Sequence, residues 1–305
     1  DAGQGAIDGV LHVRLVAAEA GYNNEVGLPL TLCRIEPDTE VVITEMGMRG
    51  PGQIRALAEI ARPDIGVITQ IAPVHLELLG TIEAIARAKA ELLDALPEEG
   101  IAIVPEHSAE LEPFIPARLD VRRVADPEVD VRDGLSYVRA GGREVAFTFA
   151  ARHQAANAAT ALAVVDALGL PFPEESVEVT FSRWRSEERE LGGGGLLIND
   201  AWNANPVAMR AALRHLRERA AGRRTVAILG EMAELGADAA GYHEEIGREA
   251  QNVDVVIGVG ELARFYDPDV WAPDAAAALE RARELVRSDD AILVKGSRSV
   301  GLESV

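Results

Sequence analysis

Two residues that could bind a metal ion follow neighbouring apolar segments. Glu45 ends the β-branched run at 41–45, and His75 lies just after the run at 65–71. If a right-handed crossover joins these runs as parallel strands, both side chains reach the same edge of one sheet. A carboxylate and an imidazole there could share a metal ion, but each could also cap a helix or lie on the surface. His75-x-Glu77 is also found in zinc deaminases, which need a further cysteine pair, so the single cysteine excludes that class.

Lys89 is a third candidate, because its type and its position are both unusual. Lys89 and Lys295 are the only lysines among 30 basic residues, so both positions are candidates for a role that arginine cannot fill. Lys89 falls on the apolar face of the helix predicted over 81–96, four residues after Ile85 and three before Leu92. Its amine either extends to the rim of that face or points into a site, where burial would lower its pKa and make it nucleophilic.

The segments that carry these residues predict an α/β fold. In the first half, the predicted strands cover 41–45, 65–71 and 100–104, and the predicted helices cover 52–61, 81–96 and 153–168. The segment 41–71 is interpreted as a βαβ unit. The stretch between 104 and about 150 has an irregular, turn-rich pattern.

After residue 190 the alternation restarts and predicts a second α/β domain. Its predicted strands cover 196–199, 224–229, 253–259 and 291–295, and its predicted helices cover 206–220, 239–251, 261–266 and 274–287. The four glycines at 192–195 are interpreted as a hairpin or interdomain turn. In open parallel sheets ligands bind at the carboxyl ends of the strands, where this domain places Asp200, Asn203, Asn205, Lys295 and Ser297.

Two further motifs carry weaker signals. Gly258-Val-Gly260-Glu-Leu-Ala263 matches a dinucleotide fingerprint, but we interpret it as an ordinary turn between a strand and a helix. His243-Glu244-Glu245 lacks the second histidine of a zinc protease, and we interpret it as the solvated start of a helix.

The charge and composition exclude several classes of protein. A net charge of −20 repels nucleic acid and anionic lipid, so we expect no nucleic-acid partner and no membrane insertion. A single cysteine allows no intramolecular disulfide. No apolar run reaches the roughly 18 residues of a membrane span, and no secretory signal opens the sequence. We expect a cytoplasmic monomer.

Eight segments, read together, form a more specific pattern. They are Tyr22–Thr31, Glu45-Met-Gly-Met-Arg-Gly50, Pro73–Gly80, Ala88-Lys-Ala-Glu91, His153-Gln-Ala-Ala-Asn157, Asn199-Asp-Ala-Trp-Asn-Ala-Asn-Pro206, Leu229–Gly236 and Lys295-Gly-Ser-Arg298. In this order they resemble the Mur ligases, and most of all the branch that joins D-Ala-D-Ala to UDP-MurNAc-tripeptide. The resemblance implies an ATP- and Mg²⁺-dependent amide ligase of peptidoglycan precursor synthesis, acting through an acyl phosphate.

The resemblance also implies roles for individual residues. Glu45 and His75 hold magnesium, although imidazole is an unusual partner for so hard a cation. Lys89 matches a lysine that the family carbamylates, a change that turns an amine into an oxygen ligand and that arginine could not undergo. Arg185 resembles a catalytic interdomain arginine that reaches the phosphates of ATP.

The remaining roles concern the nucleotide and the substrates. Asn157 resembles the residue that contacts adenine, and Asp200 matches a ribose or nucleotide contact. The resemblance places Asn203 and Asn205 on the side of the amine substrate. Lys295 and Ser297 are expected to meet a carboxylate or phosphate of a substrate.

The implied domains are a remnant of an N-terminal substrate domain at 1–12, a central parallel-sheet ATP-binding domain at 13–189 and a C-terminal Rossmann-like domain at 190–305.

The chain departs from the family in three ways. The sequence lacks the glycine-rich loop ending in Gly-Lys-Thr or Gly-Lys-Ser, and it lacks most of the domain that grips the UDP-sugar. The glycine usual before Arg185 is here Trp184. We expect the phosphate loop to exist in a longer polypeptide, before Tyr22.

Two alternatives remain. A homologue without a phosphate loop could bind a precursor or a partner and be catalytically silent. A related amide ligase, of the folylpolyglutamate or cyanophycin type, is a second alternative, against which the Asn-Ala-Asn-Pro segment argues.

Overall fold

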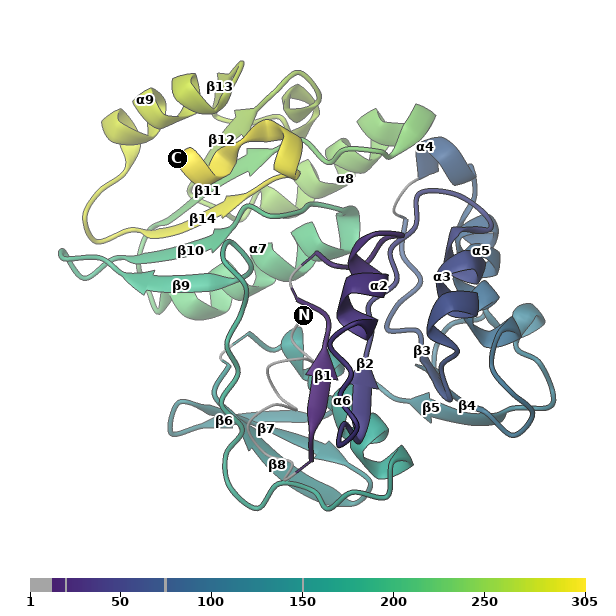
Figure 1. The fold of residues 1–305 in the computed structure, drawn as a ribbon. Helices are drawn as coiled ribbons and strands as arrows, with labels where there is room; N and C mark the ends of the chain where they lie inside the picture. The colour runs from purple at the N-terminus through teal and green to yellow at the C-terminus, as the bar shows by residue number, and fades with distance from the viewer. Residues whose placement is uncertain (1–12, 20, 74–75, 150) are drawn as a thin grey trace. The chain divides into compact units, whose positions relative to one another are not determined.

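The computed structural model describes residues 13–19, 21–73, 76–149 and 151–305. The chain divides into two compact units (Figure 1). The first comprises Asp1–Ala72 with Leu79–Thr180, and the second comprises Pro73–Leu78 with Phe181–Val305. The domain bounds inferred from the sequence stay a prediction, and the segment 1–12 lies outside the described residues.

The second unit is built on a six-stranded sheet in the order β13-β12-β11-β14-β10-β9. Its strands are β9 (Glu187–Glu190), β10 (Leu196–Asp200), β11 (Thr225–Gly230), β12 (Val255–Val259), β13 (Val270–Ala272) and β14 (Ala291–Lys295). All pairings are parallel except that of β9 with β10. The glycines at 192–195 form the hairpin turn between these two strands, where the backbone N–H of Leu191 donates to the carbonyl of Gly195. The predicted α/β class with parallel sheets is confirmed.

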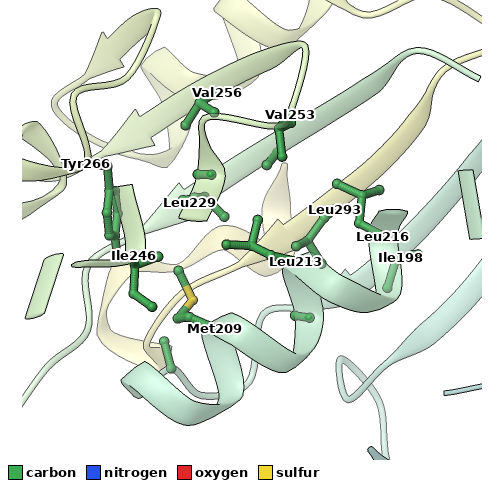
Figure 2. Close-up of a cluster of buried hydrophobic side chains, with 14 of the residues drawn as sticks. Ile198, Met209, Leu213, Leu216, Leu229, Ile246, Val253, Val256, Tyr266 and Leu293 are labelled. Carbon is green, nitrogen blue, oxygen red and sulfur yellow. The ribbon is translucent and has the colours of Figure 1, made fainter. Parts of the chain in front are cut away.

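Helices cover both faces of this sheet because its central strands are apolar on both sides. Leu229 and Leu293 face a cluster formed with α7 (Pro206–Ala220) and α8 (Ala239–Ala250) (Figure 2). Their neighbours Ile228 and Val294 face the opposite cluster, to which α9 (Ala275–Leu285) contributes.

The order of the strands creates a switch point. After β10 the chain passes through α7 to β11, and β14 returns later to lie between β10 and β11. Ligands of open α/β sheets bind beyond the carboxyl ends of the strands at such a point. The carboxyl ends of β10, β11 and β14 are therefore where a site is expected.

The described part of the first unit contains three smaller sheets. They are the parallel pair β1 (Leu15–Ala17) and β2 (Val41–Ile43), the parallel sheet β3 (Ile65–Val67), β4 (Ile101–Pro105) and β5 (Asp120–Val124), and the antiparallel sheet β6 (Val129–Arg132), β7 (Leu135–Ala140) and β8 (Arg143–Phe147). The prediction of one βαβ sheet over 41–71 is wrong, because β2 and β3 pair with different partners.

The irregular stretch expected between 104 and 150 is also corrected, since it contains β5 and the meander β6 to β8. β6 is half-buried only at Val129, and its other three residues are exposed. A strand with so little apolar surface gives a weak sequence signal. The buried face of this antiparallel sheet is formed by β7 and β8, where Val138 and Val145 lie opposite each other and are buried.

Within the described residues, the α-helices of the first unit are α2 (Gly27–Leu32), α3 (Gln53–Ala61), α5 (Ile82–Asp94) and α6 (Gln154–Ala167). The short α4 (Leu76–Leu79) spans the division between the units. α5 packs Leu93 against the sheet of β3 to β5. The carboxylate of Glu91, which is 8% exposed, accepts hydrogen bonds from the backbone N–H groups of Gly52 (2.7 Å) and Arg55 (3.1 Å). Glu91 thus caps α3, whose N-cap glycine has no side chain to do so.

Replacing Glu91 with alanine should lower the free energy of unfolding of the first unit by about 2 kcal/mol, because two backbone donors lose their acceptor. Chemical denaturation of wild type and variant measures the difference. Glu59→Ala, on the exposed side of α3, is the matched control and should change stability by less than about 0.5 kcal/mol. Equal effects of the two substitutions would refute the capping role.

Candidate functional site

A buried ion pair lies at the switch point of the second unit. Asp200 and Lys295 are the last residues of β10 and β14 and are paired in register. The ammonium of Lys295 lies 2.5 Å from Oδ2 of Asp200, and the two side chains are 3% and 15% exposed. The same ammonium donates to the backbone carbonyl of Asn203 at 3.0 Å. Lys295 therefore joins two strands to the turn that follows β10.

The second oxygen of Asp200 holds the segment that carries Arg185. Oδ1 accepts a hydrogen bond from the backbone N–H of Ser186 at 3.0 Å. The guanidinium of Arg185 lies 5.3 Å from the centroid of the Trp202 ring. The structure thus brings Asp200, Lys295 and Arg185, all predicted site residues, into one network.

The two asparagines of the Asn-Ala-Asn-Pro segment have different positions. Asn205 is the N-cap of α7, and its side-chain oxygen accepts from the backbone N–H of Ala208 at 2.9 Å. Asn203 is exposed, and its side-chain oxygen accepts from the backbone N–H of Ala204 at 2.8 Å. The contacts of both with an amine substrate stay a prediction.

Ser297 connects the loops that follow β14 and β11. Its hydroxyl accepts from the backbone N–H of Ala233 at 2.8 Å, and its own N–H donates to the carbonyl of Glu231 at 3.0 Å. The side chain is buried. Its expected contact with a substrate carboxylate or phosphate stays a prediction.

The glycine-rich turn after β12 holds a carboxylate of the protein itself. The backbone N–H of Leu262 donates to Oε1 of Glu231 at 2.8 Å, and a Cβ atom at Gly260 would lie 2.5 Å from the same oxygen. Glu231 thus occupies the position near the turn where a dinucleotide phosphate would approach. This geometry agrees with interpreting the motif as an ordinary turn.

His243 is fully buried, so the expectation of a solvated helix start is wrong. Its Nε2 accepts from the backbone N–H of Met232 at 3.0 Å, which places the ring proton on Nδ1, 2.7 Å from the carbonyl of Ala239. Burial lowers the pKa of His243 and keeps the ring neutral. The signal was present in the sequence, because Ile246 and Ala250 follow at helical spacing and are also buried.

In the first unit, Glu45 follows β2 and is half-buried. Its Oε1 accepts from the side-chain amide of Asn23 at 3.0 Å, and the backbone N–H of Gly47 donates to the carbonyl of Asn23 at 2.7 Å. Asn23 therefore orients the carboxylate. His75, the predicted partner of Glu45, lies outside the described residues.

Lys89 is half-buried on α5, and its amine donates to the backbone carbonyl of Gln70 at 2.6 Å. Gln70 follows β3, so the amine reaches the carboxyl end of that strand. Desolvation lowers the pKa of Lys89, which favours the neutral, nucleophilic amine.

Near the start of α6, the half-buried Asn157 donates from its side-chain amide to Gln154 at 2.8 Å.

The donor chemistry of the first unit is compatible with magnesium. The carboxylate of Glu45 supplies the hard oxygen that this cation prefers, and carbamylation of Lys89 would supply another. Among the residues that the structure describes, no group of three or more His, Cys, Asp or Glu side chains could hold a metal ion.

Comparison with known proteins decides the family. The model of the Mur ligase middle domain matches residues 4–165, and the model of the Mur ligase glutamate ligase domain matches residues 184–298. The chain belongs to the Mur ligase family. The resemblance in the sequence is thereby confirmed.

Several curated relatives of this Mur ligase share one name. A Mycobacterium tuberculosis protein, "UDP-N-acetylmuramoyl-tripeptide--D-alanyl-D-alanine ligase", is 34% identical over 340 residues, covering 95% of this chain and 66% of that protein. Proteins of the same name from Treponema pallidum and Bacillus subtilis are 33% and 28% identical, covering 95% and 93% of this chain and 67% of each relative. The chain thus spans about 66% of the length of the mycobacterial relative.

Solved structures support the same fold for this Mur ligase. MurF from Acinetobacter baumannii superposes with a TM-score of 0.85 at 24% identity, covering 96% of this chain and 70% of that chain. MurF ligase from Thermotoga maritima in complex with ADP also gives 0.85, at 25% identity, covering 99% of this chain and 74% of that chain. No helix within the described residues is long and apolar enough to cross a membrane.

The buried imidazole of His243 should make the stability of the second unit depend on pH. Its pKa is lower in the folded chain than its ordinary value of 6.5, so the unfolded chain takes up the proton first. The stability that the neutral ring contributes is present above pH 6.5 and is lost as the pH falls through the folded pKa, by up to about 1.4 kcal/mol per pH unit.

His243→Gln keeps an acceptor for Met232 but does not titrate. Denaturation of both proteins between about pH 7 and pH 5 should show the wild type losing its advantage over the variant as the pH falls. A stability difference that stays constant across this range would contradict the assignment of a neutral histidine.

Proposed function

We propose that this protein is an ATP-dependent ligase that joins D-Ala-D-Ala to UDP-MurNAc-tripeptide, in the synthesis of the peptidoglycan precursor. The observation that carries the proposal is the similarity to the mycobacterial D-Ala-D-Ala ligase over 95% of the chain. The network around Asp200, Lys295 and Arg185 supports it, because Arg185 lies near the carboxyl end of β10, where ligands of open α/β sheets are expected to bind.

The proposed reaction has two steps. The γ-phosphoryl group of ATP moves to the terminal carboxylate of the tripeptide, which gives an acyl phosphate and ADP. The amine of D-Ala-D-Ala then attacks the carbonyl carbon, phosphate leaves with the bonding electrons, and the amine loses a proton. Positioning and charge neutralisation limit such a reaction, because a carboxylate must approach a highly charged phosphate chain.

The residues of the second unit would act on the nucleotide and the amine substrate. Arg185 would neutralise charge on the transferred phosphoryl group. Asp200 would contact the ribose, and Lys295 would hold its carboxylate in place. The exposed Asn203 would meet the amine substrate together with Asn205, whereas Ser297 would fix the neighbouring loop and reach a substrate oxygen.

The residues of the first unit would hold adenine and magnesium. Asn157 would contact the base. Glu45, His75 and carbamylated Lys89 would bind Mg²⁺, which when bound offsets negative charge on the phosphates. In carbamylation the neutral amine of Lys89 attacks carbon dioxide and loses a proton, and the new N–C bond ends in a carboxylate. The lowered pKa of Lys89 favours this step, because only the unprotonated amine is nucleophilic.

The proposal also requires a loop that binds the phosphates of ATP. The alignment with the mycobacterial relative covers 340 positions, more than the 305 residues of this chain, so that relative has residues without a counterpart here. We propose that the natural polypeptide supplies a glycine-rich loop to the ATP phosphates, acts in the cytoplasm and works as a monomer.

A related amide ligase is less well supported. A folylpolyglutamate synthase from Thermotoga maritima superposes with a TM-score of 0.58 at 20% identity, below the 0.85 of the MurF structures. The catalytically silent homologue is tested by the same assay as the ligase.

Phosphate release by the full-length natural polypeptide tests the proposal, with ATP, Mg²⁺ and UDP-MurNAc-tripeptide present. We expect D-Ala-D-Ala to stimulate release, because its amine consumes the acyl phosphate. Stimulation by glutamate in its place would favour the folylpolyglutamate type. If calorimetry shows tight binding of UDP-MurNAc-tripeptide but no phosphate is released, the protein is the catalytically silent homologue.

Replacing Lys89 with alanine should lower kcat by about 100-fold or more, because the magnesium site loses a ligand. Lys89→Arg, which keeps the positive charge but cannot be carbamylated, should be equally impaired. Short carboxylic acids should partly restore the alanine variant and leave the arginine variant unchanged, because only alanine vacates the site. An active Lys89→Arg enzyme would end the carbamylation proposal.

A further inference from the structure

Two tryptophans and an arginine in the second unit form a cluster that the family resemblance does not explain. The rings of Trp184 and Trp202 stack, with centroids 6.2 Å apart and planes inclined by 13°. The guanidinium of Arg298 lies over both, 4.5 Å from the centroid of Trp184 and 5.3 Å from that of Trp202. Arg298 also forms an ion pair with Glu303 at 2.7 Å. We call these four residues the tryptophan–arginine cluster.

The backbone beside this cluster adopts an unfavourable conformation. Trp184 and Ser186 have φ values of +62° and +49°, in the left-handed region that favours glycine. Non-glycine residues persist there only when their surroundings hold them. Arg185 lies between the two, so the direction of its side chain depends on both strained neighbours.

Hydrogen bonds and packing hold both Trp184 and Ser186 in this conformation. Ser186 is held through its backbone N–H by Asp200. Trp184 is held by its carbonyl, which accepts from the backbone N–H of Trp202 at 3.1 Å, and by the stacked ring and the guanidinium above it. A planar guanidinium suits this stacking better than an ammonium.

We propose that Arg298 is a positioning residue that acts through Trp184 to fix Arg185 for its contact with the transferred phosphate. The inference rests on the proposed function, since it takes Arg185 as the phosphate-binding arginine. A glycine would adopt this backbone unaided, and the tryptophan–arginine cluster supplies the constraint that a tryptophan needs there.

The test compares Arg298→Gln with Trp184→Ala in the full-length polypeptide. Each should lower kcat about tenfold with the KM for D-Ala-D-Ala unchanged, because the phosphoryl transfer loses a well-placed charge. The double variant should lose no more than either single variant, because both act through one contact. Trp184→Gly should recover part of the loss, since glycine adopts the left-handed conformation without an anchor.

Circular dichroism gives a second, activity-independent signal. The stacked indoles of Trp184 and Trp202 should give an exciton couplet in the far ultraviolet, and Arg298→Gln should weaken it. Arg264→Gln is the matched control, because Arg264 also lies over a tryptophan, 3.4 Å from the centroid of Trp271, and pairs with Glu261 at 3.0 Å. The control should keep both the couplet and kcat.

Several results would overturn the inference. These are additive losses in the double variant, no recovery in Trp184→Gly, or a fall in kcat for Arg298→Gln with the couplet intact. If the wild type shows no D-Ala-D-Ala-dependent phosphate release, the proposed function fails and the positioning role fails with it. The couplet still reports whether Arg298 holds the tryptophan stack. Should Arg298→Gln not fold, Arg298→Lys takes its place in both measurements, because an ammonium stacks less well than a guanidinium and should weaken the couplet and lower kcat.

Discussion

The carboxyl edge of the second unit depends on one buried ion pair. Lys295 is 3% exposed, and an ammonium so far from water is tolerated only with a charged partner and further acceptors. Asp200 supplies the charge and the carbonyl of Asn203 supplies an acceptor. The same aspartate accepts a hydrogen bond from the backbone N–H of Ser186, just before β9. The position of Arg185 therefore depends on the ion pair between β10 and β14.

The loops around this pair are tied by backbone hydrogen bonds to side chains. Ser297 accepts from Ala233, His243 accepts from Met232, and Glu231 accepts from Leu262. Each side chain satisfies a backbone donor in a loop or, for Leu262, at the first residue of a 3-10 helix. The loop that follows β11 is therefore held at several points, which favours a site that is organised before a ligand arrives. In the first unit, Asn23 orients Glu45 by the same means.

The sequence predicted much of this architecture because its main signals are local. The apolar runs of β11, β12 and β14 and the helical pattern of α7 predict these elements. The rule that ligands bind at the carboxyl ends of parallel strands singles out Asp200 and Lys295. The pairing of Lys295 with Asp200 was not predicted, because strand order is set by tertiary packing between segments 95 residues apart. The meander β6 to β8 is not predicted because β6 has little buried apolar surface, which makes its sequence signal weak.

Histidine 243 shows a different limit of sequence interpretation. The carboxylates of Glu244 and Glu245 beside it favour solvent exposure, whereas the helical spacing to Ile246 favours burial. In the structure the His243 side chain is buried. The cluster of Trp184, Trp202 and Arg298 was not foreseen either, because nothing local relates residues from three segments of the chain.

A double-mutant cycle on Asp200 and Lys295 tests the central claim most directly. Asp200→Asn, Lys295→Met and the double variant would be compared by the free energy of unfolding of the second unit. Each single variant should lose about 3 to 5 kcal/mol, because it leaves a buried charge without its partner, and the double variant should lose much less than the sum. Additive losses would contradict the view that this pair organises the edge of the sheet.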